Sequence, residues 1–383
     1  MRPILCFMFL LVAAAAVSAQ PLNRIDPVLA EKLQTYPDDA LLQVIIVMQD
    51  QVDVNRMREA FRAARASKEV RHYQVVTALQ EKAAATQPAI LQYLAQQKAA
   101  GTVQSYESMW IVNMLLATAT KRTVLELAQR EDVGMIYEDG LLELDAPVDS
   151  SPASSSPGTA EPNLRAINAH RLWELGYTGQ GTIVMNIDTG VNGAHPGLAA
   201  RWRGNQPGVQ WYHAWYDQKV PPSPVPVDYG STKHGSHTMG IMTGLETATN
   251  DTFGVAFGAQ WIASPTIDVG FSPHTSYTLR AFQWAADPDS NPSTANDVPD
   301  VISNSYQDPN VSSTQCSGAS GYWAVVDALE AIGTAVVWSA GNAGSAAQSI
   351  TPPKNHRANH SPVCRIIPQD IPQCINLSCG KML

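Results

Sequence analysis

Apolar and polar positions between residues 20 and 144 alternate between strand-like and helix-like spacing. Short apolar runs predict three strands, at Leu41–Met48, Ser108–Thr118 and Val133–Tyr137. Stretches rich in Ala, Gln, Glu and Lys predict helices at Val52–Arg65, at Tyr73–Lys98 with a break at Pro88, and at Lys121–Arg130. The order strand, helix, strand, helix, strand predicts a small α+β domain.

From Pro162 onward, short apolar runs alternate with helical patterns and glycine turns. The predicted strands are Gly181–Asp188, Asp300–Ser303 and Thr334–Ser339, and the predicted helices are Ala166–Leu175 and Tyr322–Ile332. The run that ends at Asp188 is almost continuously apolar, which is typical of a strand covered on both faces of a parallel sheet. We therefore expect an α/β domain in this half of the chain.

Two segments of different composition flank these domains. Asp145–Glu161 is rich in Ser and Pro and predicts a linker, so we divide the chain into residues 20–144, 145–161 and 162–355. Arg2 precedes an apolar run that ends in Val17-Ser18-Ala19, which predicts a signal peptide over residues 1–19 and a secreted protein, extracellular or periplasmic. No other run is long and apolar enough to span a bilayer, so we expect no membrane partner.

Composition narrows the function classes further. The chain has 383 residues, 45% hydrophobic and 15% charged, and a formal net charge of −9. This charge and the lack of a basic run argue against a nucleic-acid partner. Of five cysteines, Cys6 falls in the signal peptide, Cys316 stands alone, and three crowd the last stretch. This placement predicts neither a disulfide framework nor a metal site.

Two residues suggest nucleophilic catalysis. Asp188 ends a strand, where working side chains collect in α/β sheets, although Asp-Thr-Gly is also an ordinary turn sequence. His234 and His237 share one helical face, so metal binding is an alternative, but neither a glutamate nor a third ligand follows within a turn. An Asp followed later by a His is the order of two members of an Asp, His, Ser triad.

Two further stretches could assist such chemistry. Asn342 lies between glycines after a predicted strand, and its side-chain amide could stabilise an oxyanion; the alternative is a turn asparagine. Asn304–Gln307 follows another strand and could offer an open edge to an extended peptide, or be an ordinary loop.

Four motifs stand in the order and spacing of a known family. They are GTIVMNIDTGVNGAHPGL at Gly181–Leu198, HGSHTMGIMTG at His234–Gly244, DVISNSY at Asp300–Tyr306 and SAGNAG at Ser339–Gly344. The chain resembles the subtilisin-like serine proteases, peptidase S8, and among them the bacillopeptidase F-like branch. The resemblance covers residues 40–355, and residues 20–144 resemble the family's inhibitor I9-like propeptide, notably at Trp110–Asn113 and Thr123–Tyr137.

This resemblance implies a fold and a set of roles. It implies a three-layer α/β domain with a parallel sheet, here incomplete, preceded by a small α+β propeptide, and a serine endopeptidase with polypeptide substrates. The implied site residues are Asp188 and His234 as the charge-relay pair, Asn342 in the oxyanion hole, and Asn304, Ser305, Tyr306 and Gln307 as the substrate-binding strand. Gln307 departs from the glycine that the family usually has beside the specificity pocket. The propeptide is implied as an intramolecular inhibitor and chaperone, with no cofactor, apart from calcium at a place the sequence does not indicate.

The resemblance stops before the nucleophile. The Gly-Thr-Ser-Met-Ala motif that carries the family's serine does not follow Asn342, and residues 356–383 show neither helical nor strand periodicity. We therefore expect a truncated protease, inactive as written, with apolar surface left uncovered around Thr334–Trp338. The alternative function is a non-catalytic pseudoenzyme that binds a peptide or a protease. Nucleotide binding at Gly181–Gly190 is disfavoured, because Asp188-Thr189-Gly190 replaces a glycine-rich phosphate loop.

Overall fold

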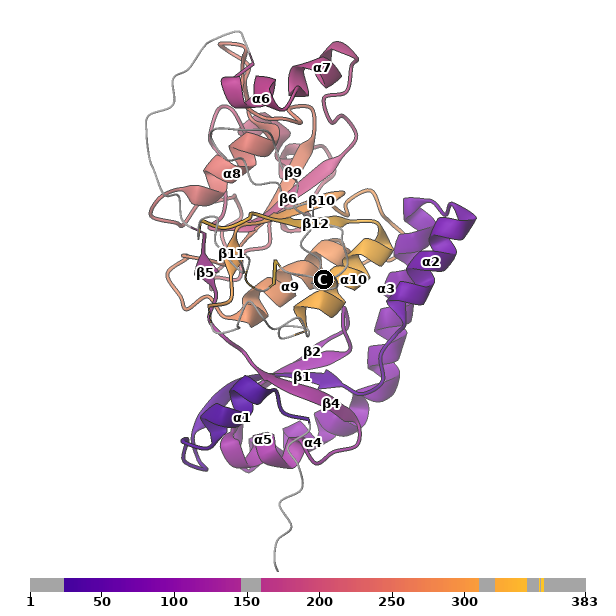
Figure 1. Cartoon of the computed structure of the whole chain (residues 1–383), viewed down its shortest axis with the longest axis vertical. Helices are drawn as coiled ribbons and strands as arrows, with labels where there is room; N and C mark the ends of the chain where they lie inside the picture. Colours follow the sequence, from indigo (N-terminus) through magenta and orange to yellow (C-terminus); the bar gives the residue numbers. More distant parts are fainter. Residues whose placement is uncertain (1–23, 146–159, 310–320, 343–350, 352, 355–383) are drawn as a thin grey trace, which may run out of the picture.

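The computed structural model describes residues 24–145, 160–309, 321–342, 351, 353 and 354. The predicted signal peptide, most of the predicted linker and the predicted tail lie outside these residues. None of the helices in the described ranges is both long and apolar enough to cross a membrane. Figure 1 shows the parts before and after the linker one above the other, with the N-terminal part at the bottom.

The N-terminal part is built on an antiparallel sheet with strand order β2-β3-β1-β4. The strands are β1 (Leu41–Met48), β2 (Val103–Met109), β3 (Met114–Thr120) and β4 (Val133–Glu138). The helices are α1 (Pro27–Leu33), α2 (Val54–Ala64), α3 (Lys68–Thr86), α4 (Pro88–Ala99) and α5 (Lys121–Leu127). The predicted strands at Leu41 and Val133 and the helix break at Pro88 are confirmed.

Both faces of the second half of β1 are covered, which explains the unbroken apolar run Val44–Met48. Val44, Ile46 and Met48 belong to a core formed with α1, α4 and α5. Ile45, on the opposite face, belongs to a second core that continues into the C-terminal part. The period of two along a strand thus sends successive side chains to two different cores.

Two predicted elements are wrong. Ser108–Thr118 is not one strand but the end of β2, a turn and most of β3, because the N–H groups of Trp110 and Ile111 donate to Gln283 Oε1 at 2.7 and 3.2 Å rather than to a neighbouring strand. The single helix predicted at Ala166–Leu175 is instead divided between α6 (Pro162–Ala166) and α7 (Ala169–Glu174). Asn168 separates them with a left-handed backbone, φ 60°.

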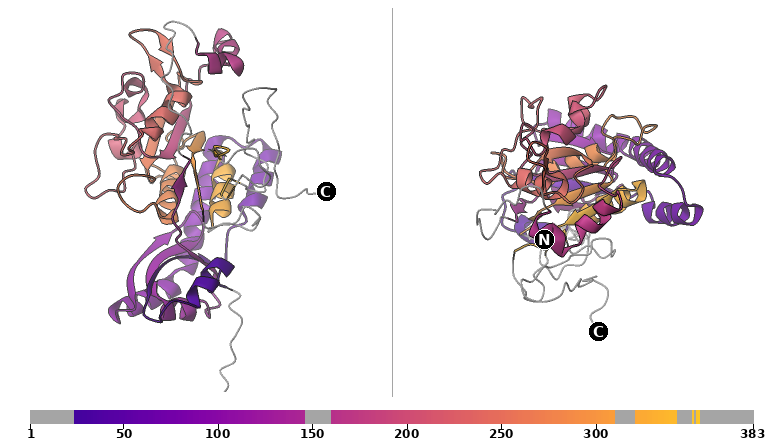
Figure 2. Two further views of the ribbon diagram at one scale, coloured as in Figure 1. Left: turned by 60° about the vertical axis from the view of Figure 1, so that its left-hand side comes forward. Right: turned by 90° about the horizontal axis from the view of Figure 1, so that it is seen from above.

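The C-terminal part is a parallel sheet between helices, as predicted. Its strand order is β12-β10-β6-β9, and every neighbouring pair is parallel. The strands are β6 (Ile183–Asp188), β9 (Gln260–Pro265), β10 (Val301–Asn304) and β12 (Ala335–Trp338), and the main helices are α8 (His234–Thr243), α9 (Thr275–Ala286) and α10 (Tyr322–Ile332). Figures 1 and 2 show α8 on one face of this sheet and α9 and α10 on the other. All six residues of β6 are buried, as its apolar run predicts.

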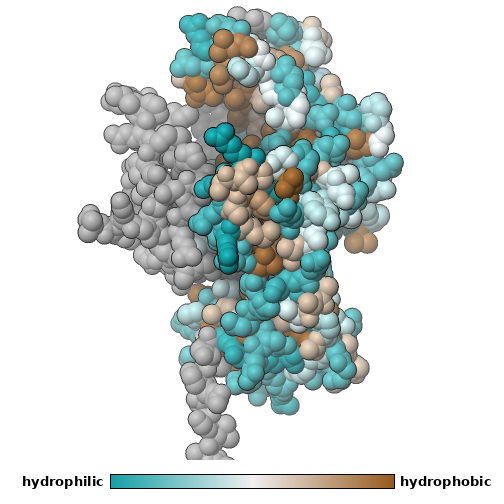
Figure 3. Space-filling model, turned by 90° about the vertical axis from the view of Figure 1, so that its right-hand side faces the viewer, coloured by the Kyte–Doolittle hydropathy of each residue, from teal (hydrophilic) through white to brown (hydrophobic). Residues whose placement is uncertain are grey.

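The apolar surface expected to be uncovered around Thr334–Trp338 is covered on one face of β12, whereas on the other face Ala335 is exposed and Val337 is half-buried. The side chains of Val336 and Trp338 are only 1% and 7% exposed, because both join the core that contains α9 and α10. Brown, hydrophobic side chains gather instead at the top of the molecule in Figure 3, where α6 and α7 lie. Leu172 and Leu175 of this region are 53% and 71% exposed.

The two parts share an extensive contact. α2 and α3 lie along α10, as Figure 1 shows on its right-hand side. Arg58 pairs with Glu330 at 2.7 Å, and Lys68 pairs with Asp300 at 2.7 Å. Together with the shared core, these ion pairs fix the N-terminal sheet beneath α9 and α10.

Candidate active site

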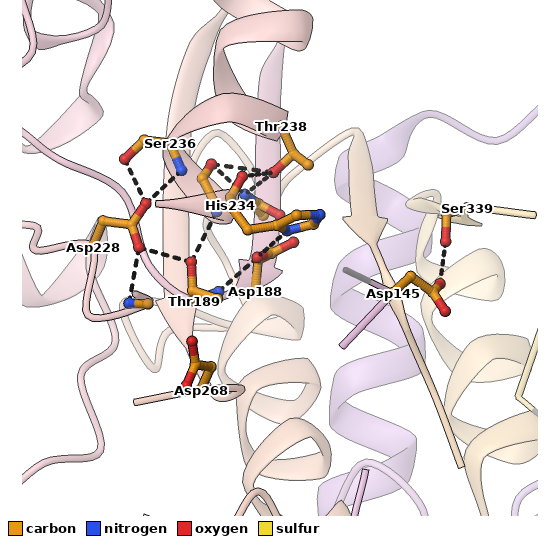
Figure 4. Close-up of polar contacts among 12 residues, drawn as sticks. Asp145, Asp188, Thr189, Asp228, His234, Ser236, Thr238, Asp268 and Ser339 are labelled. Atoms are coloured by element: carbon orange, nitrogen blue, oxygen red, sulfur yellow. Dashed lines mark hydrogen bonds and ion pairs between the residues drawn. The ribbon is translucent and has the colours of Figure 1, made fainter. Parts of the chain in front are cut away.

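A carboxylate at the end of β6 is hydrogen-bonded to a histidine at the start of α8. Asp188 and His234 are 1% and 6% exposed. The Nδ1 atom of His234 lies 2.8 Å from Oδ1 of Asp188, and the Thr189 N–H donates to the same oxygen at 2.7 Å (Figure 4). Because an ionised carboxylate only accepts hydrogen bonds, Nδ1 carries the proton. The fold thus brings together the two residues that the sequence predicts as a relay pair.

A second buried carboxylate holds the first turn of α8. The N-cap residue of α8, Lys233, makes no side-chain hydrogen bond to the helix. Asp228, which precedes the helix in the chain, caps it instead. Oδ2 of Asp228 accepts the N–H of Ser236 at 2.8 Å and its hydroxyl at 2.6 Å, and Oδ1 accepts the hydroxyl of Thr189 at 2.7 Å. That hydroxyl in turn accepts the N–H of Gly235 at 2.8 Å. Asp228 therefore ties the helix that carries His234 to the residue after Asp188.

The close approach of this helix to β6 requires glycine. A Cβ atom on Gly235 would lie 2.0 Å from the carbonyl oxygen of Gly190, and one on Gly190, where φ is +102°, would lie 2.1 Å from that of Val227. No side chain fits at either position. The two glycines thus set how near His234 lies to Asp188.

Burial and charge act in opposite directions on the relay pair. For His234, burial lowers the pKa, but the hydrogen bond to Asp188 and the charges of Asp188, Asp228 and Asp145 outweigh burial, so the pKa is raised. For Asp188, burial raises the carboxyl pKa, and the hydrogen bonds from His234 and Thr189 oppose this shift. The site therefore favours a proton on the imidazole more strongly than water does.

An extended segment of the chain itself, residues 140–145, lies between two other segments, and we call the space that it occupies the cleft. On one side, the N–H of Leu142 donates to Pro273 at 2.8 Å, and the N–H of Thr275 donates to Gly140 at 2.8 Å. On the other side, β5 (Glu143–Leu144) pairs antiparallel with β11 (Tyr306–Gln307). The segment thus adds a strand between two edges, as a bound peptide does.

The four residues predicted as a substrate-binding strand divide between two tasks. Ser305, Tyr306 and Gln307 meet the segment: the Ser305 carbonyl accepts the N–H of Asp145 at 2.8 Å, and the other two pair with β5. The Asn304 side chain points inward instead, where Nδ2 donates to Val337 at 3.1 Å and Oδ1 accepts the Tyr306 hydroxyl at 3.0 Å. Its side-chain amide thus links β10 to β12 and to Tyr306 of β11, and does not contact the segment in the cleft through these bonds.

Asn342 and Asp145 meet where the segment leaves the cleft. The Nδ2 atom of Asn342 donates to the carbonyl oxygen of Asp145 at 3.4 Å. The carboxylate of Asp145 accepts from Lys354 Nζ at 2.7 and 2.5 Å and from the Ser339 hydroxyl. Figure 4 shows the His234 ring pointing toward the side on which Asp145 and Ser339 lie.

Four residues of this site were missed from the sequence: Asp145, Asp228, Ser339 and Lys354. Asp145 is the first residue of the predicted linker, Ser339 begins the SAGNAG motif but was given no role of its own, and Asp228 and Lys354 lie in loops without a recognisable motif. Only the three-dimensional structure shows that these four residues lie at the site. As for metals, no three His, Cys, Asp or Glu side chains gather into a possible binding site within the described ranges, and His237 is exposed on α8.

Comparison with known proteins identifies related sequences. Residues 179–360 match the model of the subtilase family, peptidase S8. Bacillopeptidase F of Bacillus subtilis (strain 168) is 30% identical over 249 residues, which cover 61% of this chain and 17% of that protein. Subtilisin amylosacchariticus of Bacillus subtilis subsp. amylosacchariticus is 28% identical over 240 residues, 63% of this chain and 52% of that protein. The chain therefore spans at most about half the length of these relatives.

A structural neighbour is more distant. The crystal structure of the epidermin leader peptide processing serine protease from Staphylococcus aureus superposes with a TM-score of 0.46 and 13% identity, over 80% of this chain and 61% of that one. The sequence match carries the comparison: residues 179–360, which hold the parallel α/β sheet and the buried Asp–His pair, match the subtilase family, peptidase S8.

Proposed function

We propose that this protein is a subtilisin-like serine endopeptidase in which Asp188 and His234 form the charge relay. The observation that carries the proposal is the 2.8 Å bond between His234 Nδ1 and Asp188 Oδ1, at the end of a cleft that binds an extended segment by strand addition. With Nδ1–H donated to Asp188, the Nε2 atom of the neutral ring carries the lone pair that accepts a serine hydroxyl proton. Asp188 then stabilises the imidazolium that this transfer creates.

The Asn342 amide supplies the second part of the proposed chemistry. It donates to the carbonyl of Asp145, which is the last described residue of the segment in the cleft. A donor aimed at a carbonyl oxygen stabilises the negative charge that forms there on attack, and removing such a donor typically costs about 3–4 kcal/mol of transition-state stabilisation.

The third member of the charge relay, the nucleophilic serine, is not identified in this sequence. The serines after Asn342 are Ser345, Ser349, Ser361 and Ser378, and none stands in a Gly-Thr-Ser-Met-Ala motif. We propose that a polypeptide of these 383 residues binds peptide in the cleft without hydrolysing it, since acyl transfer needs the nucleophile.

We also propose that residues 20–144 act as an intramolecular inhibitor and chaperone of the domain that follows. The segment in the cleft continues directly from the N-terminal sheet, and that sheet packs against α9 and α10. Export by the signal peptide over residues 1–19 is part of the same proposal.

The relay can be tested without turnover. An NMR titration should assign His234 a pKa above the ordinary histidine value and a hydrogen-bonded Nδ1 proton, and Asp188→Asn should lower that pKa, because burial is then opposed only by the charges of Asp228 and Asp145. A His234 titration that is unchanged in Asp188→Asn would refute the relay.

Turnover separates the enzyme from the second candidate function, a non-catalytic peptide- or protease-binding pseudoenzyme. The observation behind this candidate is the segment that pairs with β11 through β5. Incubation with fluorescent casein and a serine-directed probe should give neither hydrolysis nor labelling. Hydrolysis together with labelling would show that one of the remaining serines acts as the nucleophile.

A further inference from the structure

We propose that the cleft selects peptides with an acidic side chain, aspartate above all, at the residue whose carbonyl faces Asn342, and that Lys354 is the specificity-determining residue. This inference rests on the proposed function, because it gives a substrate class to the same cleft. In the structure the position is held by Asp145, the last described residue of the segment in the cleft.

Backbone contacts place Asp145 next to the groups proposed to bind and cleave the peptide. Its N–H donates to Ser305 at 2.8 Å, next to the pairing of Leu144 with Tyr306, so it continues the added strand. Its carbonyl accepts from Asn342, the donor proposed for the oxyanion. Its charge is also felt by the His234 ring. The residue that meets all three groups is the one on the acyl side of the bond to be cut.

The side chain of Asp145 is enclosed with an opposite charge. The side chains of Lys354 and Asp145 are 1% and 5% exposed, and their charged atoms lie 2.5 Å apart at the closest. The Ser339 hydroxyl donates to the same carboxylate. Burial lowers the pKa of Lys354, and the charge of Asp145 is the opposing influence. An enclosed ammonium without a counter-charge is costly, so the pocket favours a carboxylate over any neutral or basic side chain.

The walls of the pocket keep the ammonium in place. Gly341 has φ +75°, and a Cβ atom there would lie 2.8 Å from Lys354 Nζ, so any larger residue would displace the charge. The Thr351 hydroxyl donates to Gln307 Oε1 at 2.9 Å, and the Lys354 N–H donates to the Thr351 carbonyl at 3.1 Å. Gln307, the residue that departs from the family's glycine, thus fastens the Lys354 segment to the strand that binds the peptide.

The pocket also sets a length preference. Both carboxylate oxygens of Asp145 already lie within 2.7 Å of Lys354 Nζ, so the fit is complete with one methylene between backbone and carboxylate. Glutamate would require the lysine to withdraw. We therefore expect aspartate to be preferred over glutamate, and glutamate over asparagine.

Substitutions that remove or reverse the charges of Asp145 and Lys354 in the intact chain test this inference. Hydrogen exchange is followed at the amide of residue 145, which donates to Ser305, and at the amide of Leu142, which donates to Pro273. Asp145→Asn should reduce the protection factor of the residue 145 amide about 10-fold, and Asp145→Lys about 100-fold. Adding Lys354→Glu to Asp145→Lys should restore most of that protection, because the pair is then reversed.

Two controls make the result specific. Lys68→Met removes another lysine–aspartate pair between the same two parts of the chain, away from the cleft, and should leave the ranking at residue 145 unchanged. Lys354→Met covers the case in which Lys354→Glu fails to fold. In a chain that carries Lys354→Met, adding Asp145→Asn should no longer reduce the protection at residue 145.

The outcomes separate the two proposals. If the amides of Leu142 and Asp145 exchange without protection in the unaltered chain, the cleft does not bind an extended segment, and the proposed function fails together with this inference. If both are protected but the protection at residue 145 is the same for aspartate, asparagine and lysine, the proposed function stands and the acidic preference is refuted.

Discussion

The Asp228 carboxylate binds both the N–H and the hydroxyl of Ser236, and so closes the first turn of the helix that begins with His234. This contact lies on the far side of the helix start from Asp188. The position of the histidine is therefore set by two buried carboxylates, one bound to its ring and the other to its backbone neighbours.

Replacing Asp228 by alanine should lower the free energy of unfolding by about 2–3 kcal/mol, because it leaves the N–H of Ser236 and the hydroxyl of Thr189 without their acceptor. Urea denaturation measures the loss. Asp50→Ala is the matched control, since it removes an exposed aspartate paired with Lys82 and should cost about 0.5 kcal/mol or less. Equal losses in the two variants would contradict the capping role of Asp228.

Gly235→Ala should destabilise the protein by about 3 kcal/mol, or push α8 away from β6, because the added Cβ would overlap the Gly190 carbonyl at 2.0 Å. Gly240→Ala is the control in the same helix, where the nearest atom is a Phe253 ring carbon at 3.3 Å. Thermal unfolding should separate the two variants clearly. A Gly235→Ala protein as stable as Gly240→Ala would show that the contact between helix and strand is looser than described.

Local pattern predicted the elements that build this site, and long-range contacts decided the rest. The strand β6 was predictable because burial on both faces requires an almost continuous apolar run. The helix α10 was predictable because most of its residues are apolar and buried. The turn between β2 and β3 was not, because Gln283 of a distant helix binds its N–H groups. Lys354 and Asp145 are 209 residues apart, and no local signal shows that their charges meet.

Asn304→Ala should lower global stability by about 2–3 kcal/mol, because it leaves the Val337 carbonyl and the Tyr306 hydroxyl without their partner in a fully buried place. Chemical denaturation gives this value. Tyr306→Phe is the companion variant: it removes one of the same bonds without a cavity and should cost less. If Asn304→Ala weakened peptide binding without changing stability, Asn304 would contact the peptide directly instead of bracing the sheet.

The last prediction concerns pH. The pKa of His234 is raised in the folded chain, so the folded state holds this proton more tightly than the unfolded state, whose histidine titrates near 6.5. The stability that the charged pair contributes is therefore fully present below about pH 6.5 and is lost as the pH rises through the higher folded pKa.

Unfolding free energies measured across that range should fall for the natural chain. They should fall less for Asp188→Asn, in which the partner charge is gone and burial lowers the histidine pKa. A general base must be neutral, so the same titration places the rise of any hydrolytic activity above the ordinary histidine pKa. Parallel stability curves for the two proteins would mean that the Asp188 carboxylate does not hold the imidazolium, and the charge relay would lose its physical basis.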